Sequence, residues 1–197
     1  MRLGKVLLAS TAAAVLLGTL VGSASARNFS ISNQFVSIAF RTVTFEGPFG
    51  DIVCEVRVEG SFHQRTTAKR VGSLVGHLTS AALPGCSAGR ATILRETLPW
   101  HVRYLGFAGT LPNITNIRAN IVRAAFQITQ LFTCQSTSTE TNPMIITLNR
   151  EIPTRVVTTA TIGGTLPSTC GTEGRFRSDA APVFLLNTTT RLTLTLI

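Results

Sequence analysis

The stretch 98–112 constrains the fold of this chain most, because it reads as one extended segment at the centre of the sequence. It holds the only Trp and the only Tyr of the chain, Trp100 and Tyr104, which alternate with polar residues such as His101. Residues two apart in a strand lie on the same face, so Trp100, Val102 and Tyr104 share one side. The pattern predicts a central strand whose rings pack in a core, and it gives no sign of a reaction centre.

A second segment shows the same period of two most clearly. Ile52, Cys54, Val56 and Val58 alternate with residues that are mostly charged. Further short runs of this kind follow between turns rich in Gly and Pro, about nine or ten in all. The chain is therefore predicted to be all-β, a single-domain antiparallel β-sandwich or closed β-barrel, and the pattern does not choose between these two.

Three segments carry more specific expectations. The segment 114–132 fits both a helical period and a period of two, and its Ile, Val, Phe and Thr content favours a long strand with a bulge near Ala124 and Ala125. The polar run 28–33 predicts a frayed start of the mature chain. Alternating leucines in 192–196 predict a last strand that lies deep in a sheet.

Residues 1–26 have the pattern of a secretory signal peptide. A basic start with Arg2 and Lys5 precedes an apolar block and a small-residue step that ends at Ala26. The apolar block is short for a membrane span, which needs about 20 residues, although an uncleaved anchor is the alternative. We expect cleavage after Ala26, which leaves 27–197 as one secreted domain without a membrane span. The sequence does not define its oligomeric state.

All four cysteines follow the predicted signal peptide, and an even count in an exported chain is typical of disulfides. Three pairings can be drawn from four cysteines. We favour Cys54 with Cys86 and Cys134 with Cys170, because each pair then brackets one half of the chain. Closing loops of this length stabilises the folded state by about 3–4 kcal/mol each. A zinc site is disfavoured, since no two of these cysteines lie close together in sequence.

The charge of the chain favours anionic partners. The chain has 18 Lys and Arg against 9 Asp and Glu, and loss of Arg2 and Lys5 with the signal peptide lowers the formal charge from +9 to +7. Most of these cations are Arg, the side chain that pairs with phosphate and carboxylate in a fixed geometry. The alternative is that the Arg content reflects only a GC-rich genome.

The segment 60–70 is the candidate anion-binding loop. It holds Arg65, Lys69 and Arg70 without a carboxylate, so a sulfate, phosphate or carboxylate could be forked by its two arginines. A smaller basic cluster, Arg175 and Arg177, is a second candidate. The alternative for both is a solvated surface with no ligand.

The sequence contains no catalytic constellation. His63, His77 and His101 stand far apart in the sequence. As a strand residue opposite the rings, His101 is expected to face solvent. The acidic side chains are expected to pair across strands with arginines; they are Asp51, Glu55, Glu59 and Glu96, opposite Arg57, Arg95 and Arg103.

Cofactors, metals and nucleic acids are not expected as partners. The sequence shows no metal-ligand spacing, no Walker A loop and no dinucleotide fingerprint. A single-strand binder needs exposed aromatic rings between basic residues, whereas Trp100 and Tyr104 are predicted to face the core.

Three features are spaced as in a known family. They are the run 60–63, Cys86, and the block 98–112 with its L-P-W-H-V-R-Y start and its F-x-G-x-L-P end. In this spacing the chain resembles a family of exported actinobacterial β-proteins with no established activity. The resemblance covers about residues 52–197, and the central block is its most specific part. It implies export and a β fold, and it carries over no catalytic or binding residue.

These observations lead to one functional hypothesis and two alternatives. We expect a secreted, non-catalytic β domain, a binding or structural module whose basic loop binds an anionic cell-surface polymer. The first alternative is a secreted hydrolase that uses His101 as general base. The second is an interaction or assembly protein that binds through an exposed sheet edge or an apolar patch.

Overall fold

The computed structural model describes residues 28–47, 50–87, 89–151, 154–171 and 173–197. The predicted signal peptide and its cleavage site lie outside the described residues. Within them, no helix is long and apolar enough to cross a membrane.

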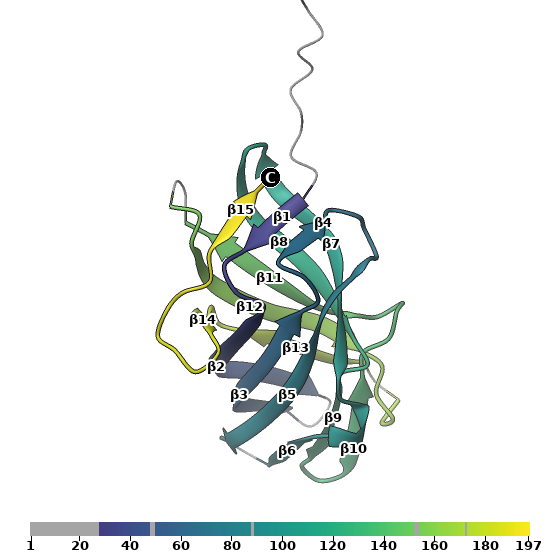
Figure 1. The fold of residues 1–197 in the computed structure, drawn as a ribbon. Helices are drawn as coiled ribbons and strands as arrows, with labels where there is room; N and C mark the ends of the chain where they lie inside the picture. The colour runs from purple at the N-terminus through teal and green to yellow at the C-terminus, as the bar shows by residue number, and fades with distance from the viewer. Residues whose placement is uncertain (1–27, 48–49, 88, 152–153, 172) are drawn as a thin grey trace, which may run out of the picture.

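Almost all regular structure in these ranges is β-strand (Figure 1). A single 3-10 turn, η1, covers Arg95–Thr97. The strands are β1 (Asn28–Ile31), β2 (Phe35–Gly47), β3 (Gly50–Phe62), β4 (Thr66–Ala68), β5 (Leu74–Cys86), β6 (Arg90–Ile93), β7 (Trp100–Thr110), β8 (Asn113–Val122), β9 (Ala125–Thr129), β10 (Thr133–Thr137), β11 (Met144–Arg150), β12 (Val157–Leu166), β13 (Gly174–Ser178), β14 (Val183–Leu185) and β15 (Leu194–Leu196).

The main sheet closes on itself. Its antiparallel order runs β2, β3, β5, β7, β8, β11, β12 and β13, and β13 pairs back onto β2. The long strand β2 is shared at this seam: residues 43–46 pair with β13, and residues 36–38 pair with β14. Of the two predicted architectures, the hydrogen-bonded ladders therefore form the closed barrel, and its strands follow chain order.

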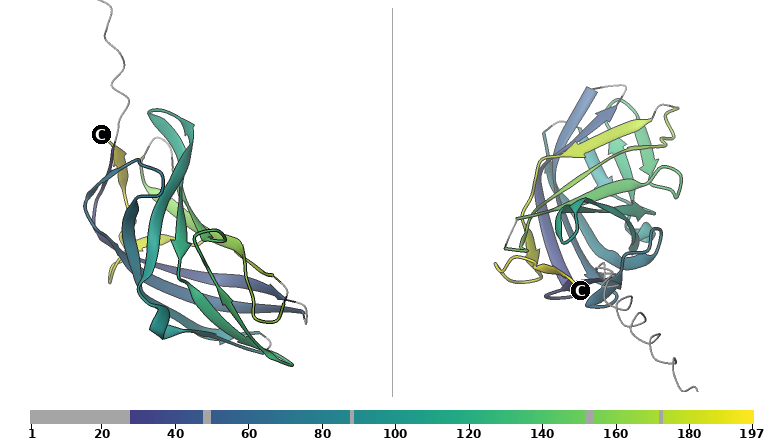
Figure 2. Two further views of the ribbon diagram at one scale, coloured as in Figure 1. Left: turned by 90° about the vertical axis from the view of Figure 1, so that its right-hand side faces the viewer. Right: turned by 90° about the horizontal axis from the view of Figure 1, so that it is seen from above.

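Two small three-stranded sheets lie at opposite ends of the barrel (Figure 1). One has the order β15-β1-β4, and the other has the order β10-β9-β6. Figure 2 shows from the side how the long strands of the barrel extend between these two ends. We call them the terminal sheet (β1, β4 and β15) and the inner-hairpin sheet (β6, β9 and β10).

The predicted inward faces are confirmed. Ile52, Cys54, Val56 and Val58 are 1–4% exposed, and Trp100 is fully buried. The buried side chains of the barrel and of both small sheets form one hydrophobic cluster. The two-residue period of the sequence thus indicates which side chains face the barrel interior and which face outward.

Three expectations need correction. The segment 114–132 is extended as predicted, but it forms two strands in different sheets instead of one strand with a bulge. The chain turns at Arg123, whose φ is 71°, and its N–H donates to the Ser138 carbonyl. The Ala124 N–H donates to the Ser138 hydroxyl. Contacts with a residue far along the chain hold this corner, so the local sequence does not reveal it.

Both chain ends also differ from expectation. The run 28–33 is not frayed, because β1 pairs with β15 and β4 and buries Phe29 and Ile31. The last strand is not deep in a sheet: β15 is an edge strand with β1 as its single neighbour in the terminal sheet. Leu194 of β15 is nevertheless buried, because its side chain packs against the barrel interior.

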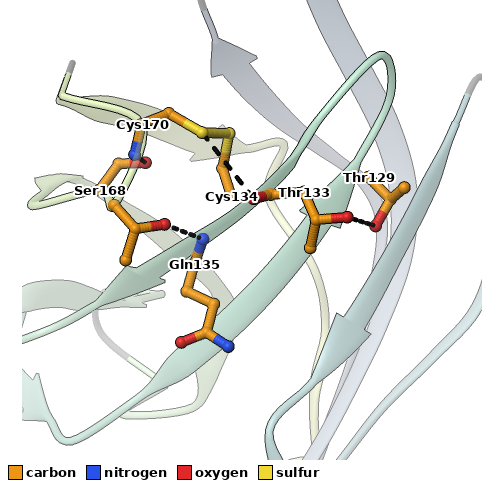
Figure 3. Close-up of a disulfide and its surroundings, with 7 residues drawn as sticks. Thr129, Thr133, Cys134, Gln135, Ser168 and Cys170 are labelled. Atoms are coloured by element: carbon orange, nitrogen blue, oxygen red, sulfur yellow. Dashed lines mark hydrogen bonds between the residues drawn. A yellow bond between two sulfur atoms is a disulfide. The ribbon is translucent and has the colours of Figure 1, made fainter.

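The predicted disulfides are confirmed. Cys54 and Cys86 are direct partners of the β3–β5 ladder, and they form a disulfide. Cys134 of β10 is joined to Cys170 in the β12–β13 connection (Figure 3). Beside this second disulfide the Gln135 N–H donates to the Thr169 hydroxyl at 2.9 Å. The Cys134–Cys170 disulfide therefore links the inner-hairpin sheet to the barrel wall.

Candidate functional site

The barrel interior contains an apolar cavity under the terminal sheet. Its volume is about 80 Å³, and its lining is almost entirely hydrocarbon. The barrel wall contributes aliphatic side chains such as Ile38, Ile117 and Ala119, and the terminal sheet contributes Phe29 and Leu194. Strands from around the barrel therefore point aliphatic side chains into one common space.

Tyr104 contributes an aromatic ring to this apolar lining. Tyr104 is 4% exposed and lines the cavity, and its ring packs on Phe29 with centroids 5.6 Å apart. Its hydroxyl forms no hydrogen bond with any residue in the described ranges. Burial raises the pKa of this phenol above its ordinary value of 10.0. The hydroxyl is not one of the fully buried polar atoms that lack a partner, and the cavity surface is almost entirely apolar, so Tyr104 contributes its ring to the cavity.

A lysine contacts the Phe29 ring and a second ring, that of Phe107. The Lys69 Nζ lies 5.5 Å from the centroid of Phe29 and 5.7 Å from that of Phe107, in cation–π contact with both rings. Burial lowers its pKa from the ordinary value of 10.5. Among the described residues Lys69 has no carboxylate partner. A partly dehydrated ammonium therefore stands next to a wall of the cavity.

The predicted anion-binding residues fall into two separate places. Arg65, Lys69 and Arg70 flank β4, whose Thr67 lines the cavity. Arg175 and Arg177 lie on β13 instead, which pairs with β2 at the barrel seam. Arg177 is already paired with Glu46, at 3.1 Å between Nε and Oε1. The structure thus brings the basic loop to the cavity and leaves the second cluster away from it.

The expected cross-strand ion pairs are replaced by others. Arg57 pairs with Glu55 of its own strand at 2.9 Å. Arg103 pairs with Glu140 at 3.1 Å, and Glu140 was not among the predicted partners. All these pairs lie at the surface, where each contributes little to stability.

All three histidines of the chain meet on the outside of the barrel, which the sequence analysis missed. His77 of β5 is the direct ladder partner of His101 on β7, and His63 follows the end of β3. The His63 Nε2 and the His77 Nδ1 are 2.9 Å apart. The His77 ring lies between the other two, with centroid distances of 4.6 Å to His63 and 5.0 Å to His101. Only the strand register, which no local pattern encodes, could have revealed this histidine row (His63, His77 and His101).

Close packing of two strands fixes this histidine row. A Cβ added to Gly60 would collide with the carbonyl oxygen of His77, and one added to Gly76 would collide with that of Ser61. Both glycines let β3 and β5 approach closely. Burial, followed by the charges of His63 and His101, lowers the pKa of His77 below 6.5. The His77 ring is therefore neutral at pH 7.

His101 borders a shallow surface hollow that also includes Ser138, Glu96 and Glu140. The Ser138 hydroxyl accepts a hydrogen bond from the Ala124 N–H and is buried, and Glu140 is paired with Arg103. Within the described part of the chain, His101 forms no hydrogen bond to a hydroxyl or a carboxylate. The nucleophile, base and orienting acid of a hydrolase are thus not assembled around it.

Comparisons with known proteins add no assignment: no family model, no curated protein and no solved structure matches this chain. In the described ranges, no group of three or more His, Cys, Asp or Glu side chains is arranged around a metal-sized space.

Proposed function

We propose that this protein is an exported, non-catalytic binding protein that takes the apolar end of a small anionic amphiphile into its barrel. The observation that carries the proposal is the apolar cavity of about 80 Å³ under the terminal sheet. Eight-stranded barrels commonly hold one small ligand in this position.

The size of the cavity limits the ligand. An engineered cavity of about 150 Å³ in another protein accommodates benzene, so a space about half as large takes only a short hydrocarbon segment. A short straight or branched acyl chain fits this limit, and a long fatty acid would have to displace β1 or β15.

The basic loop supplies the charge that such a ligand needs. Lys69 packs on Phe29, which itself lines the cavity, and Arg65 and Arg70 lie close by in the chain. A carboxylate or phosphate head group at this point would pair with cations that have no acidic partner among the described residues. The alternative proposal is that an anionic cell-surface polymer binds the same loop and does not enter the cavity.

The test is a calorimetric titration of the protein with straight-chain carboxylates from butyrate to octanoate. Each buried methylene contributes about 0.8 kcal/mol, so affinity should rise about fourfold per carbon and then stop rising once the cavity is full. Ala119→Leu fills the cavity and should abolish this dependence on chain length. Thr115→Leu is the matched control, because it adds the same side chain at an exposed position of β8.

Variants of Lys69 test whether the head group binds the basic loop. Lys69→Met should weaken carboxylate binding and leave the matching alcohols unchanged, while Lys69→Arg should retain most of the affinity. Arg175→Met on β13 should have no effect. Equal affinity for all chain lengths, with binding lost only in Lys69→Met, would refute the cavity ligand and favour the surface polymer.

A further inference from the structure

The histidine row has features that a solvated strand face does not explain. All three histidines of a 197-residue chain converge there from three separate segments. Two of their ring nitrogens point at each other across 2.9 Å. Neither the cavity nor the basic loop uses these nitrogens.

The geometry of the pair is close to that of metal ligation. Imidazole nitrogens bind Zn²⁺ at about 2.0–2.1 Å, so two of them in a tetrahedral site stand about 3.3–3.4 Å apart. The His63 and His77 nitrogens need to separate by only about 0.4 Å to reach this distance. His63 is exposed and follows the end of β3, so its ring can make this adjustment without moving the barrel.

We propose that His63 Nε2 and His77 Nδ1 bind one divalent transition-metal ion of the Zn²⁺ or Cu²⁺ class, with water completing its coordination. The N–H that joins the two nitrogens shifts to the other nitrogen of the same ring, so each neutral imidazole offers one lone pair. Imidazole suits these ions, whereas Mg²⁺ and Ca²⁺ prefer oxygen ligands.

The surroundings support this assignment to the pair. His77 is held rigidly in the β3–β5 and β5–β7 ladders, and its ring is packed edge-on by His101. His101 thus packs beside the His77 ring and is not a ligand. The four cysteines are all in disulfides, so no thiol competes for the metal.

The test is a titration of the tag-free full protein with ZnCl₂ and CuCl₂, followed by calorimetry at about pH 7.5, where unperturbed imidazole is neutral. We expect one ion per chain, tighter binding of Cu²⁺ than of Zn²⁺, and no binding of Mg²⁺. His63→Gln and His77→Gln should each weaken binding by about tenfold or more. His101→Gln should change the affinity by less than about threefold, because it removes a packing neighbour and no ligand.

A second measurement keeps the result interpretable if a variant folds poorly. Metal that binds only the native state raises the melting temperature, so Zn²⁺ should stabilise the wild type and not His63→Gln, whose change lies at an exposed position. Unchanged affinity in His63→Gln, or an equal loss in His101→Gln, would overturn the assignment. Binding of Mg²⁺ as tightly as Zn²⁺ would do so as well.

Discussion

The two ends of the barrel interior are built differently, although the same strands run through both. At the end covered by the inner-hairpin sheet, four aromatic rings interlock: Phe126 lies 5.5 Å from Phe45 and from Trp100, and 6.3 Å from Phe176, between ring centroids. At the end covered by the terminal sheet, Phe29 and Tyr104 form a ring pair, and shorter aliphatic side chains leave a cavity. We call these the aromatic end and the cavity end.

The two ends also differ in the hydrogen bonding of their buried aromatic side chains and in the position of the disulfides. The Trp100 Nε1–H donates to the Thr97 hydroxyl at 2.9 Å, whereas the Tyr104 hydroxyl has no partner within the described residues. Both disulfides are near the aromatic end. Cys54 pairs in register with Val43, which lies two residues from Phe45 on β2, and Cys134 lies in the inner-hairpin sheet. The cavity end is closed by hydrogen-bonded strands from the two chain ends. The comparison shows that the aromatic end is more closely packed and more cross-linked than the cavity end.

The largest expected effect compares two buried phenylalanines. Phe126→Ala should lower the free energy of unfolding by about 3–5 kcal/mol, because it removes a ring from close packing. Phe29→Ala should cost clearly less, because its ring already borders an empty space and β1 can relax. Urea denaturation followed by circular dichroism measures both. Equal losses would mean that the two ends are equally well packed.

The next effect concerns the disulfide that ties the inner-hairpin sheet. Cys134→Ala with Cys170→Ala should cost about 3–4 kcal/mol of stability. The matched pair, Cys54→Ala with Cys86→Ala, closes a loop of similar length and should cost about the same, since the sequence separations are 36 and 32. Neither double variant should change ligand affinity at the cavity end. A loss of carboxylate binding in the Cys134 and Cys170 variant would show that the two ends are coupled.

The smallest effect is the titration of the single tyrosine. Because burial raises the pKa of Tyr104 above 10.0, its phenolate absorbance should appear at a higher pH in the native protein than in urea. The neutral phenol is favoured in the fold, so its contribution to stability is constant below the unfolded pKa and is lost as pH rises through the folded one. Tyr104→Phe should remove this alkaline loss. Coincident native and unfolded titrations would show that the fold does not shield this hydroxyl from water.

The local pattern of apolar residues and the order of the cysteines were sufficient to predict some features of the structure correctly. The alternation at 52–58 predicted which side chains face inward, and the bracketing of the chain by its cysteines predicted both disulfides. The run 28–33 was misjudged although Phe29 and Ile31 already alternate, because two apolar residues are a weak signal until a partner strand is known.

The sequence by itself determined that the chain is all-β and which faces of its strands are buried, and it favoured the cysteine pairing that the structure shows. These properties follow from the two-residue period of a strand and from the count and order of the cysteines. Tertiary structure alone decided that β13 pairs with β2 to close the barrel, that His63, His77 and His101 meet, and that a cavity remains. Ring closure and histidine contact depend on the register between strands distant in sequence. The cavity depends on the summed volume of side chains from around the whole ring.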